Sequence, residues 1–569
     1  MTQHSQSKSP VTLPEPIRVD SVDELNWNDE QDIVVAGFGG AGAAAALEAR
    51  EQGASVIALD KYQGGGATAR SGGVVYLGGG TRYQKEAGFD DNAEEMFKYL
   101  SQETADAVKP ETLKRFCDQS LENMAWLEQQ HVKFAGNVPS VKTSYPTDKY
   151  FLYYSGNEAV ESYAEHARPA PRGHRVAGSG LSGPILFSAL KESAVDKGVK
   201  LQLQSEVTRL VVNQNGDVLG VEVRRLMPGA SAAKKHKRHD TLSAKTALSM
   251  PAFSVKQRKK AEEIHNREGV VEYVRARKGV VLSTGGFIFN REMVNSYGPK
   301  YTGGLPLGTG TCDGSGILLG QSAGGAIDRM DKVSAWRFIN PPMAWAQGIV
   351  VNDKGERYCN EEVYGARLGY EMCENHNGRG ILIINKALRK EAMKQIMPGK
   401  AWGFQIIPAL LSMFMNSRKA NSIASLASTL DMPEANLEAT IRKYSAAARG
   451  EATDDFGKSD KFLAPLDEGP WYAMDMSVDC SVFPCPVMTL GGLKVDEESG
   501  QVMKDDGQVI KGLYSAGRNA VGVASNLYLS GLSIADCIFS GRRASRHAVS
   551  ISTAEESINN EKTPVSEPC

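Results

Sequence analysis

The apolar positions that follow a polar N-terminal stretch predict a strand, a helix and a second strand in succession. QDIVVAG, at residues 31–37, is a short apolar run typical of a buried parallel strand. AGAAAALEAREQG continues as a helix that ends at Gly53, and ASVIALD, at residues 54–60, is a second apolar run. This order is that of a βαβ unit, so we expect a parallel sheet covered by helices.

Further along the chain, residues 92–130 have helical periodicity, and residues 200–225 alternate between apolar and polar positions. The alternating stretch turns at Asn215-Gly216, as the two strands of a hairpin do. GVVLSTGGF, at residues 279–287, predicts another buried strand.

Residues 228–278 interrupt this pattern with the basic runs KKHKR and KQRKK around an apolar ALSMPAF. We interpret them as an insertion that projects from a loop as a solvated, mobile excursion. Two alternatives stay open: a basic, amphipathic patch on anionic lipid, and a contact with nucleic acid.

Composition sets limits on the whole molecule. A chain of 569 residues with 41% apolar residues is long enough for two domains. The polar ends, 1–26 and 550–569, are predicted to be poorly ordered. A net charge of -2 gives no overall attraction to nucleic acid, so we expect no nucleic-acid partner.

The eight cysteines are scattered without metal-ligand spacing, which favours reduced core thiols and no metal site. A polar start and the lack of a run of about 18 apolar residues predict a soluble, cytoplasmic protein. Peripheral contact with the inner face of the membrane, through the basic insertion, is an open alternative.

The first chemical signal is a glycine-rich turn between the first strand and the helix. Gly37, Gly39 and Gly42 form G-x-G-x-x-G, in which the glycines permit a tight turn, the approach of a pyrophosphate and close helix–strand packing. The helix N-terminus offers free N–H groups to phosphates. Asp60, at the end of the second strand, stands where an acid binds an adenosine ribose. We therefore predict a dinucleotide site.

FAD is favoured over NAD by glycine-rich stretches far from this turn. GGGATARSGG, at residues 64–73, offers small residues and hydroxyls to a long cofactor. LSTGG, at residues 282–286, and GLYSAGR, at residues 512–518, end two further strands. No second motif marks an NAD site, so we expect the electrons to leave to a separate acceptor.

Together with GTCDGSG, at residues 310–316, and the helix after Gly531, these motifs resemble the fumarate reductase/succinate dehydrogenase flavoprotein superfamily over residues 32–548. The resemblance implies an α/β fold: a Rossmann-like FAD-binding domain, at 27–326 and 466–549, interrupted by a smaller α+β catalytic domain at 327–465. The FAD contacts that it implies are Gly37, Gly39, Gly40, Ala41, Gly42, Asp60, Lys61, Gly65, Gly66, Ala67, Thr68, Ser71, Gly72, Gly73, Val207, Thr284, Gly285, Gly286, Asp313, Gly517, Arg518, Ser533 and Ile534.

Within the superfamily, Tyr528 stands where fumarate reductases place an arginine that clamps a substrate carboxylate. With SGGVVYLGGGT, YYSGNE, ARPAPRGHR, RYCNEEVYGARLG and the Tyr528-x-Ser530-Gly531 element, the chain resembles the 3-ketosteroid dehydrogenases, most of all the branch that oxidises the C4–C5 bond of 5α-reduced 3-ketosteroids. The Δ1-dehydrogenase branch has a tyrosine where Leu527 would fall, so it is the alternative.

Dehydrogenation beside a ketone requires polarisation of the carbonyl, loss of an α proton and transfer of a hydride to flavin N5. The resemblance implies Tyr364, Tyr528 and Ser530 as the catalytic set, with Gly531 as a backbone donor. Our hypothesis gives the α proton to Tyr528, supported by Ser530, and the carbonyl to Tyr364; the exchanged roles stay open.

Competing hypotheses are a flavin ene-reductase or dehydrogenase acting on another apolar ketone or acid, and a membrane- or nucleic-acid-binding module that holds flavin as structure. His174 could act as an acid or base, but a structural role in its Gly/Pro-rich loop is the simpler interpretation.

Overall fold

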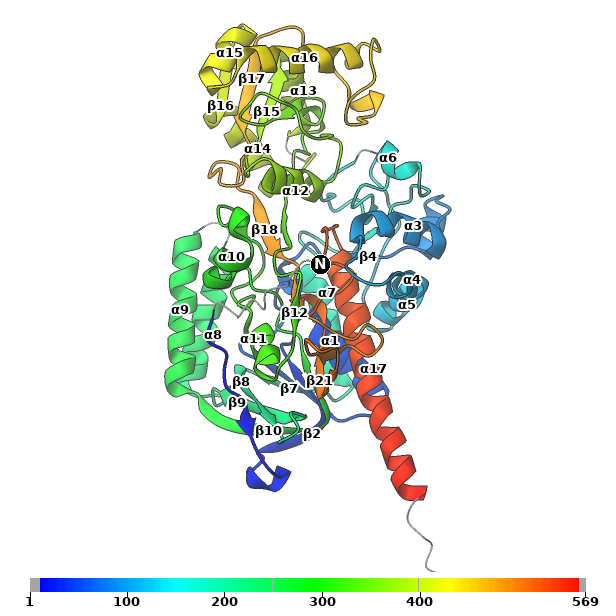
Figure 1. Cartoon of the computed structure of the whole chain (residues 1–569), viewed down its shortest axis with the longest axis vertical. Coiled ribbons are helices and arrows are strands. Elements are labelled where there is room, and N and C mark those ends of the chain that lie inside the picture. Colours follow the sequence, from blue (N-terminus) through cyan, green and yellow to red (C-terminus); the bar gives the residue numbers. More distant parts are fainter. Residues whose placement is uncertain (1–10, 141, 248–249, 398, 562–569) are drawn as a thin grey trace, which may run out of the picture.

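The computed structural model of the chain describes residues 11–140, 142–247, 250–397 and 399–561. Figure 1 shows a large lower body built around one sheet and a smaller body above it, coloured green to yellow, that is formed by the middle of the sequence. Strands from both sides of this middle segment meet in the lower sheet. The predicted α/β architecture, a Rossmann-like domain interrupted by a smaller domain, is confirmed.

In the described residues, nine strands form the central sheet in the order β1-β8-β9-β10-β2-β3-β7, with β21 beside β10 and β20 beside β21. The core of the sheet is parallel, since β7, β3, β2, β10 and β21 pair in parallel. β8 and β9 form the predicted antiparallel hairpin. The bounds are β1 (Ile17–Arg18), β2 (Asp29–Ala36), β3 (Val56–Asp60), β7 (Lys200–Leu203), β8 (Ser205–Val212), β9 (Val218–Arg225), β10 (Val270–Leu282), β20 (Gln501–Met503) and β21 (Val509–Ser515).

The two faces of the sheet are covered by different elements because side chains alternate along a strand. Ile33 and Val35 of β2 pack in the core cluster that contains the helix α1 (Gly40–Glu51). Val34 and Ala36 face the other cluster, which contains residues of α11 (Ser315–Ser322). This double cover explains the continuous apolar run of β2.

Helix α1 packs along the C-terminal helix α17 (Leu532–Glu561), and small residues let the two approach closely. A Cβ on Gly541 would lie 2.5 Å from the carbonyl oxygen of Ala41. Glu48, buried on α1, forms 2.6 Å ion pairs with Arg542 and Arg546 of α17. The start of α1 is therefore held by a segment some five hundred residues further along the chain.

The other elements of the lower body surround this unit. Helical periodicity between residues 92 and 130 is confirmed by three helices. A three-stranded sheet, in the order β4-β6-β5, lies between them and the start of α17. The bounds are β4 (Val74–Tyr76), β5 (Leu152–Tyr153), β6 (Gly173–Arg175), α2 (Arg82–Glu86), α3 (Ala93–Thr104), α4 (Pro110–Asp118), α5 (Ser120–Gln129), α6 (Glu161–Ala164), α7 (Gly183–Asp196) and α10 (Arg291–Tyr297).

The upper body has an antiparallel sheet in the order β14-β15-β17-β16, covered by five helices of the described residues. The bounds are β14 (Ile349–Val351), β15 (Ile381–Asn385), β16 (Ser417–Ala420), β17 (Trp471–Asp475), α12 (Gly365–Asn375), α13 (Lys386–Gln395), α14 (Gly403–Met415), α15 (Ile423–Leu430) and α16 (Glu434–Ala448). Two small sheets link the bodies, one of β11 (Leu305–Pro306), β18 (Pro486–Thr489) and β13 (Val333–Ala335), the other of β12 (Ile327–Asp328) and β19 (Gly492–Leu493).

The boundary predicted at residue 465 is wrong. β17 lies beyond it, yet pairs with both β15 and β16 in the sheet of the upper body. At the other boundary, β12 and β13 lie after residue 326 but pair with β19 and β18, which follow the upper body in the sequence. Both differences come from strand pairs between residues far apart in sequence, which periodicity alone does not identify.

The insertion is not the mobile loop that we predicted. It forms a helical hairpin, α8 (Ser231–Thr246) and α9 (Pro251–Glu268), and its last predicted residues, from Val270 onward, belong to β10. His236 and His265 are buried on its inner side, and the His236 ring stacks on Tyr62 at 5.2 Å. The hairpin is therefore packed on the lower body (Figure 1).

The chain ends also differ from the prediction where the structure describes them. Val19 is buried, and the short strand β1 before it pairs with β8, so the stretch from residue 11 to 26 is not a disordered tail. α17 continues to Glu561, past the predicted limit at residue 549. Residues 1–10 and 562–569 lie outside the described residues.

Candidate functional site

The glycine-rich turn lies where β2 ends and α1 begins. A Cβ on Gly37 would meet the backbone of Ser283 at 2.8 Å, and one on Gly42 would lie only 1.9 Å from the carbonyl oxygen of Gly37. Gly37 also has a φ of 95°, which only glycine adopts without strain. The first and third glycines of the motif therefore serve the tight turn and the close packing of helix on strand.

The middle glycine differs, because its Cα faces open space. A Cβ on Gly39 would have nothing nearer than 3.8 Å, and the same holds for Gly66, whose nearest neighbour is Gly39 itself. A Cβ on Gly285 would meet only the Sγ of Cys312, at 3.5 Å. These three glycines expose bare backbone beside the N-terminus of α1, so the residues fit the pyrophosphate of a dinucleotide.

Asp60 ends β3, as predicted for a ribose-binding acid. Its two carboxylate oxygens accept N–H groups from Phe38 at 3.0 Å, Tyr62 at 2.8 Å and Gly64 at 3.2 Å. Burial raises the pKa of the Asp60 carboxyl, and these hydrogen bonds oppose the rise. Asp60 thus orients the loop after β3 in addition to the ribose role that we predict for it.

A cavity of about 410 Å³ lies next to this loop and brings three of the predicted cofactor residues together, Lys61, Val207 and Asp313. Its wall also contains residues that the sequence did not single out: Pro14, Glu206, Thr208, Arg224, Glu262, Asn266, Ser315, Leu318 and Leu319. Glu262 and Asn266 come from α9, so the basic insertion forms part of this wall.

Lys61 and Glu206 form a 2.8 Å ion pair across the cavity wall, and the Glu206 carboxylate also lies 3.4 Å from His265 of the hairpin. Burial opposes ionisation of Glu206, but these two partners outweigh it and lower its pKa to about 2. Asp313 lies two residues before α11 and accepts the N–H of Ser315, the first residue of the helix, at 3.0 Å.

The predicted contacts at 65–73 have packing partners of their own. Gly40 donates its N–H to the Thr68 hydroxyl at 3.1 Å, which ties the segment that includes Ala67 to the start of α1. A Cβ on Gly65 would meet Ala69 at 2.6 Å, one on Gly72 would meet the Tyr145 ring at 2.4 Å, and one on Gly73 would meet the backbone of Ser182 at 2.4 Å. Ser71 bonds to Thr68 and Gly73. Close packing therefore accounts for the small residues of segment 65–73. Contact between this segment and FAD stays a prediction.

The ends of β10 and β21 lie beside the first turn of α1. Thr284 donates to Asn519 at 3.0 Å, and a Cβ on Gly286 would lie 2.5 Å from the Thr489 hydroxyl oxygen. A Cβ on Gly517 would lie 2.8 Å from Cβ of Ala41. Two widely separated strands thus end beside the first turn of α1, as the resemblance implied.

Arg518 follows this turn without an acidic partner. Among the described residues no carboxylate lies within salt-bridge distance of it, and its N–H groups point at sulfur atoms, Met488 Sδ at 3.9 Å and Cys312 Sγ at 3.6 Å. Its charge lowers the pKa of Tyr528, against the larger effect of burial. An unpaired cation of this kind fits an anionic group of a bound cofactor.

The predicted catalytic residues come together at the other end of the site. Tyr528, Ser530 and Gly531 precede α17, whose first turn holds the predicted contacts Ser533 and Ile534. Gly531 has a φ of 92° and accepts the Tyr76 N–H at 3.1 Å, while a Cβ on it would lie 2.8 Å from that nitrogen. Its carbonyl is therefore occupied by β4, and its close approach to β4 requires glycine.

Tyr153 is a site residue that the sequence analysis did not propose. Its hydroxyl lies 3.0 Å from the Ser530 hydroxyl, both are buried, and Ser530 donates its own N–H to the Ser155 carbonyl at 3.3 Å. Burial raises the pKa of Tyr153, and Ser530 opposes the rise. The motif YYSGNE contained Tyr153, but only its distance to Ser530 in space assigns it to the site.

Tyr364 comes from the upper body and is placed by contacts on both sides. It precedes α12, and its N–H donates to Asn157 Oδ1 of the lower body at 2.6 Å. Gly365 and Gly369 let α12 lie directly on β13, since a Cβ on Gly369 would be 1.9 Å from the Ala335 carbonyl oxygen. Docking of the two bodies therefore sets the position of Tyr364.

An aromatic cluster lies between Tyr364 and Tyr528. The Trp336 ring lies 4.6 Å from Tyr528 and 6.3 Å from Tyr364, and the Phe338 ring lies 5.9 Å from Tyr364. The Tyr364 hydroxyl and the Trp336 Nε1 are buried and have no hydrogen-bond partner among the described residues. Buried donors without partners are uncommon, so this cluster is suited to an apolar ligand that carries an acceptor oxygen.

The electrostatics of the two tyrosines differ. Burial raises the pKa of Tyr528 to about 12, while Arg518 and a backbone hydrogen bond from Gly531 act to lower it. Burial raises the pKa of Tyr364 well above its usual value, and the phenols of Tyr528 and Tyr153 raise it further, while Ser530 acts to lower it. The phenolate form is therefore easier to reach on Tyr528 than on Tyr364.

His174 is fully buried and hydrogen-bonded on both ring nitrogens, to the Thr81 hydroxyl at 3.0 Å and the Arg172 carbonyl oxygen at 3.1 Å. Burial lowers its pKa to about 4. These contacts belong to the β4–β6 sheet and match the structural interpretation.

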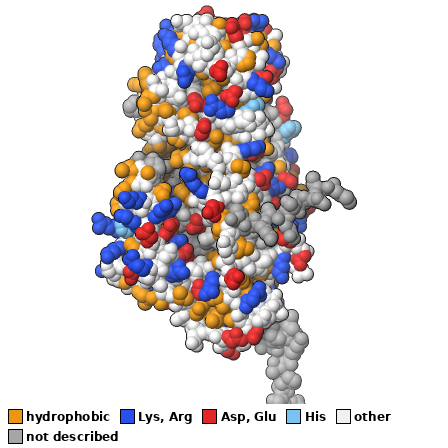
Figure 2. Space-filling model, turned by 60° about the vertical axis from the view of Figure 1, so that its left-hand side comes forward, with side chains coloured by type: hydrophobic (Ala, Val, Ile, Leu, Met, Phe, Trp, Pro, Cys, Tyr) orange, Lys and Arg blue, Asp and Glu red, His pale blue; other side chains and the backbone are white. Residues whose placement is uncertain are grey.

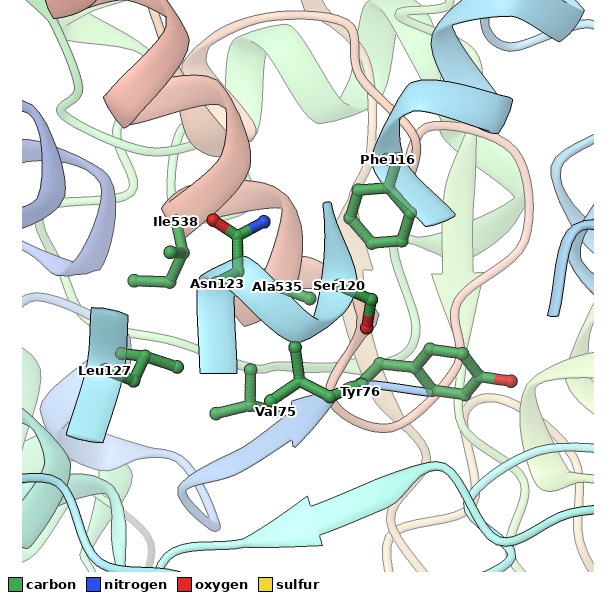
Figure 3. A pocket seen from close by; sticks show the side chains of 9 residues that line it. Val75, Tyr76, Phe116, Ser120, Asn123, Leu127, Ala535 and Ile538 are labelled. Atoms are coloured by element: carbon green, nitrogen blue, oxygen red, sulfur yellow. The ribbon is translucent and has the colours of Figure 1, made fainter. Parts of the chain in front are cut away.

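A second hollow, between β4, α5 and α17, is shown in Figure 3. It is lined by Val75, Tyr76, Leu77, Phe116, Ser120, Asn123, Leu127, Ala535 and Ile538. It has no room for a water molecule, so it is a packing defect and not a ligand site.

We also searched the described residues for metal-binding groups, disulfides and membrane-spanning helices. In the described ranges, no group of three or more His, Cys, Asp and Glu side chains is placed to hold a metal ion. The seven described cysteines are free thiols and six of them are buried, while Cys569 lies outside the described residues. None of the helices in the described part of the chain is long and apolar enough to cross a membrane.

The fold and the site together define a two-domain, FAD-dependent oxidoreductase. A family model described as an FAD binding domain matches residues 32–534, and the chain belongs to this family. The resemblance inferred from the motifs, to the flavoproteins that include fumarate reductases and 3-ketosteroid dehydrogenases, is confirmed. FAD is the cofactor that this membership indicates.

Within this family, the chain is similar to several 3-ketosteroid dehydrogenases. The chain is 42% identical, over 527 residues, to the 3-oxo-5-alpha-steroid 4-dehydrogenase of Comamonas testosteroni, covering 90% of this chain and 97% of the relative. It is 26% identical to the 3-oxosteroid 1-dehydrogenase of Mycobacterium tuberculosis, covering 88% and 94%. The crystal structure of 3-ketosteroid-delta4-(5alpha)-dehydrogenase from Rhodococcus jostii RHA1, in complex with 4-androstene-3,17-dione, matches with a TM-score of 0.79 and 30% identity, covering 94% and 99%.

Proposed function

We propose that this protein is an FAD-dependent 3-ketosteroid dehydrogenase that forms a C=C bond beside the 3-keto group, at C4–C5 of 5α-3-ketosteroids. The observation that carries the proposal is the buried cluster of Tyr528, Ser530, Tyr153 and Tyr364, which lies among the aromatic side chains of Trp336 and Phe338. Similarity to the 3-oxo-5-alpha-steroid 4-dehydrogenase, 42% over 90% of the chain, supports the choice of substrate and bond.

In this proposal the unpartnered Tyr364 hydroxyl donates a hydrogen bond to the 3-keto oxygen. Its raised pKa keeps it protonated, and a buried donor placed in advance stabilises the charge that develops on that oxygen. Trp336 and Phe338 exclude water from the cluster, which strengthens this interaction.

Tyr528 accepts the proton of the α carbon, because Arg518 favours its phenolate form. The Ser530 hydroxyl, two residues further along the chain, lies 3.0 Å from that of Tyr153, and these two groups can exchange a proton. Bound FAD supplies the acceptor for the hydride that leaves the β carbon. The substrate thus loses one proton and one hydride, and the C=C bond forms between the two carbons.

Product analysis tests this proposal. The purified protein is incubated with a 5α-saturated 3-ketosteroid or with its Δ4-unsaturated counterpart, each with an artificial electron acceptor, and Tyr528→Phe protein serves as the control. We expect a Δ4 product from the first substrate and no turnover of the second. A C1–C2 double bond from either substrate would assign the Δ1 activity instead, and no turnover of either would contradict the proposal.

Electrons leave to a separate acceptor, because the chain carries a single glycine-rich dinucleotide motif. The α8–α9 hairpin makes a peripheral contact with anionic lipid; exposed Met250 and Phe253 near its tip, beside exposed Lys256 and Lys260, support this contact.

A further inference from the structure

Helix α14 of the upper body presents an apolar face to solvent. Its inner side packs through Ala409, Ser412 and Met413, which are buried. On the outer side, Ile407 is 58% exposed, Phe414 63% and Met415 73%. Phe404 and Leu411 continue the same stripe, at the helical spacing i, i+3, i+7 and i+10. A stripe of large apolar side chains in water marks a surface that binds a partner.

The segment around this stripe is strongly basic. Residues 386–419 contain seven Lys and Arg residues and one acidic residue, in a chain with a net charge of -2. Lys390, Lys400, Arg418 and Lys419 are exposed, and the single acid, Glu391, is paired with Lys394 at 3.1 Å. The apolar stripe therefore belongs to a segment with a strong excess of positive charge.

The stripe also leads towards the catalytic cluster. Trp402, just before α14, donates its Nε1–H to the Pro146 carbonyl at 2.9 Å, and the Tyr145 ring lies 6.2 Å from Phe404. Tyr145 packs with Val74 and Tyr153 in one small core cluster, against which Trp402 also lies. Tyr153 in turn reaches Ser530. Aromatic side chains thus form a continuous series from the exposed face of α14 to the site.

We propose that α14 docks on an anionic lipid surface and that an apolar ketone passes from the lipid to the site along these aromatic side chains. An apolar stripe within a basic segment is complementary to acyl chains beneath anionic headgroups. A second copy of this chain fits less well, since a two-fold interface would place the basic segment against itself. The route, but not the docking, rests on the proposed function.

The position of α14 agrees with the lipid contact that we predict for the α8–α9 hairpin. Figure 2 shows hydrophobic side chains along the left-hand edge of the upper body, and more of them below it, above the blue cluster of the basic hairpin. One surface could thus meet α14 and the tip of the α8–α9 hairpin together.

Sedimentation with vesicles tests the docking on the whole protein with its flavin. Vesicles of phosphatidylcholine alone are compared with vesicles that also contain phosphatidylglycerol. The variant is Ile407→Asp/Phe414→Asp, and the matched control is Val195→Asp, which replaces a side chain 53% exposed on α7. We expect the wild type and the control to bind the anionic vesicles, and the double variant to bind them about tenfold or more weakly.

Lys390→Glu/Lys400→Glu tests the charge, and it should weaken binding to anionic vesicles while leaving the weak binding to neutral vesicles unchanged. The docking is wrong if the wild type does not bind anionic vesicles, or if the double aspartate variant binds them as well as the control. The docking is also wrong if the wild type forms a dimer through this face. In that case the two aspartates would dissociate the dimer, and vesicles would not compete with its formation.

The route is tested by presenting the steroid inside the vesicles or dispersed by a cyclodextrin. The double aspartate variant should lose turnover only with vesicle-bound steroid. If its turnover relative to the wild type is the same with vesicle-bound and with cyclodextrin-dispersed steroid, the route is wrong. Docking is measured without turnover, so a protein that binds the vesicles but oxidises no steroid contradicts the proposed function and leaves the docking supported.

Discussion

The two ends of the site are built in opposite ways. At the dinucleotide end, residues 37–42 form one continuous turn, and at Gly37 and Gly42 backbone atoms lie so close that a Cβ is excluded. At the substrate end, Tyr153, Tyr364 and Ser530 come from three distant segments and both bodies. The Tyr153 hydroxyl lies 3.0 Å from that of Ser530, whereas Tyr364 is held by its backbone N–H, which donates to Asn157 Oδ1. The first end depends on local packing, whereas the second depends on how the two bodies dock. Substitutions at the two ends should therefore fail in different ways.

The largest effect is expected at Gly42. In Gly42→Val, the new side chain would overlap the Gly37 carbonyl, and the strain should destabilise the protein by about 4 kcal/mol or more. We expect little soluble, flavin-bound protein, measured by flavin absorbance per protein and by urea denaturation.

Gly39→Ala is the matched control in the same turn, because its Cβ would enter open space. This variant should fold with nearly normal stability but hold FAD weakly, since the methyl group blocks the approach of the pyrophosphate. If Gly39→Ala unfolds as readily as Gly42→Val, the distinction between packing and cofactor glycines is wrong.

Tyr528→Phe should have the next largest effect, this time on the reaction alone. Without the hydroxyl there is no proton acceptor at this position, so kcat should fall about 10³-fold while flavin content stays normal. Tyr514→Phe is the control, since it removes a buried phenol that contacts His547 away from the site. Normal turnover by Tyr528→Phe would exclude it as the base.

A smaller effect is expected at Tyr153, which acts through Ser530. Tyr153→Phe removes one hydrogen bond, so kcat should fall about tenfold with KM nearly unchanged. The pH profile of kcat should also move, because the group beside Ser530 no longer exchanges a proton. A change in KM alone would mean that Tyr153 only shapes the pocket.

The same contrast explains what the sequence could and could not predict. The turn at Gly37, the strands around it and Asp60 were predicted correctly in position, because they form one local unit with a fixed spacing. Tyr528, Ser530 and Tyr364 were found only through motif resemblance, and their catalytic roles stay predictions. Tyr153 was missed, because nothing in its local pattern points to Ser530, some 377 residues away in sequence.

The errors have a related cause. The basic runs of the insertion concealed the positions that bury it: Ala233 and His236 on α8, and Ala261, Ile264 and His265 on α9, recur at helical spacing among charged residues. β17 was assigned to the wrong body because its partners, β15 and β16, lie earlier in the sequence. Pairings over such distances depend on the complete fold.

The effect that is smallest at neutral pH concerns stability at the substrate end, where His174 holds β6 to Thr81. Burial lowers its folded pKa from 6.5 to about 4, so between these values the unfolded chain binds more protons than the folded one. Stability from this group is therefore complete above about pH 6.5 and is lost as the pH falls towards 4. Between about pH 7.5 and 5 the loss should amount to ~2 kcal/mol in urea denaturation. His174→Gln, which cannot take up a proton, should lower stability near pH 7.5 but remove this part of the pH dependence. An unchanged slope in the variant would mean that His174 keeps a normal pKa, and its role as a buried, neutral link between β6 and Thr81 would then be wrong.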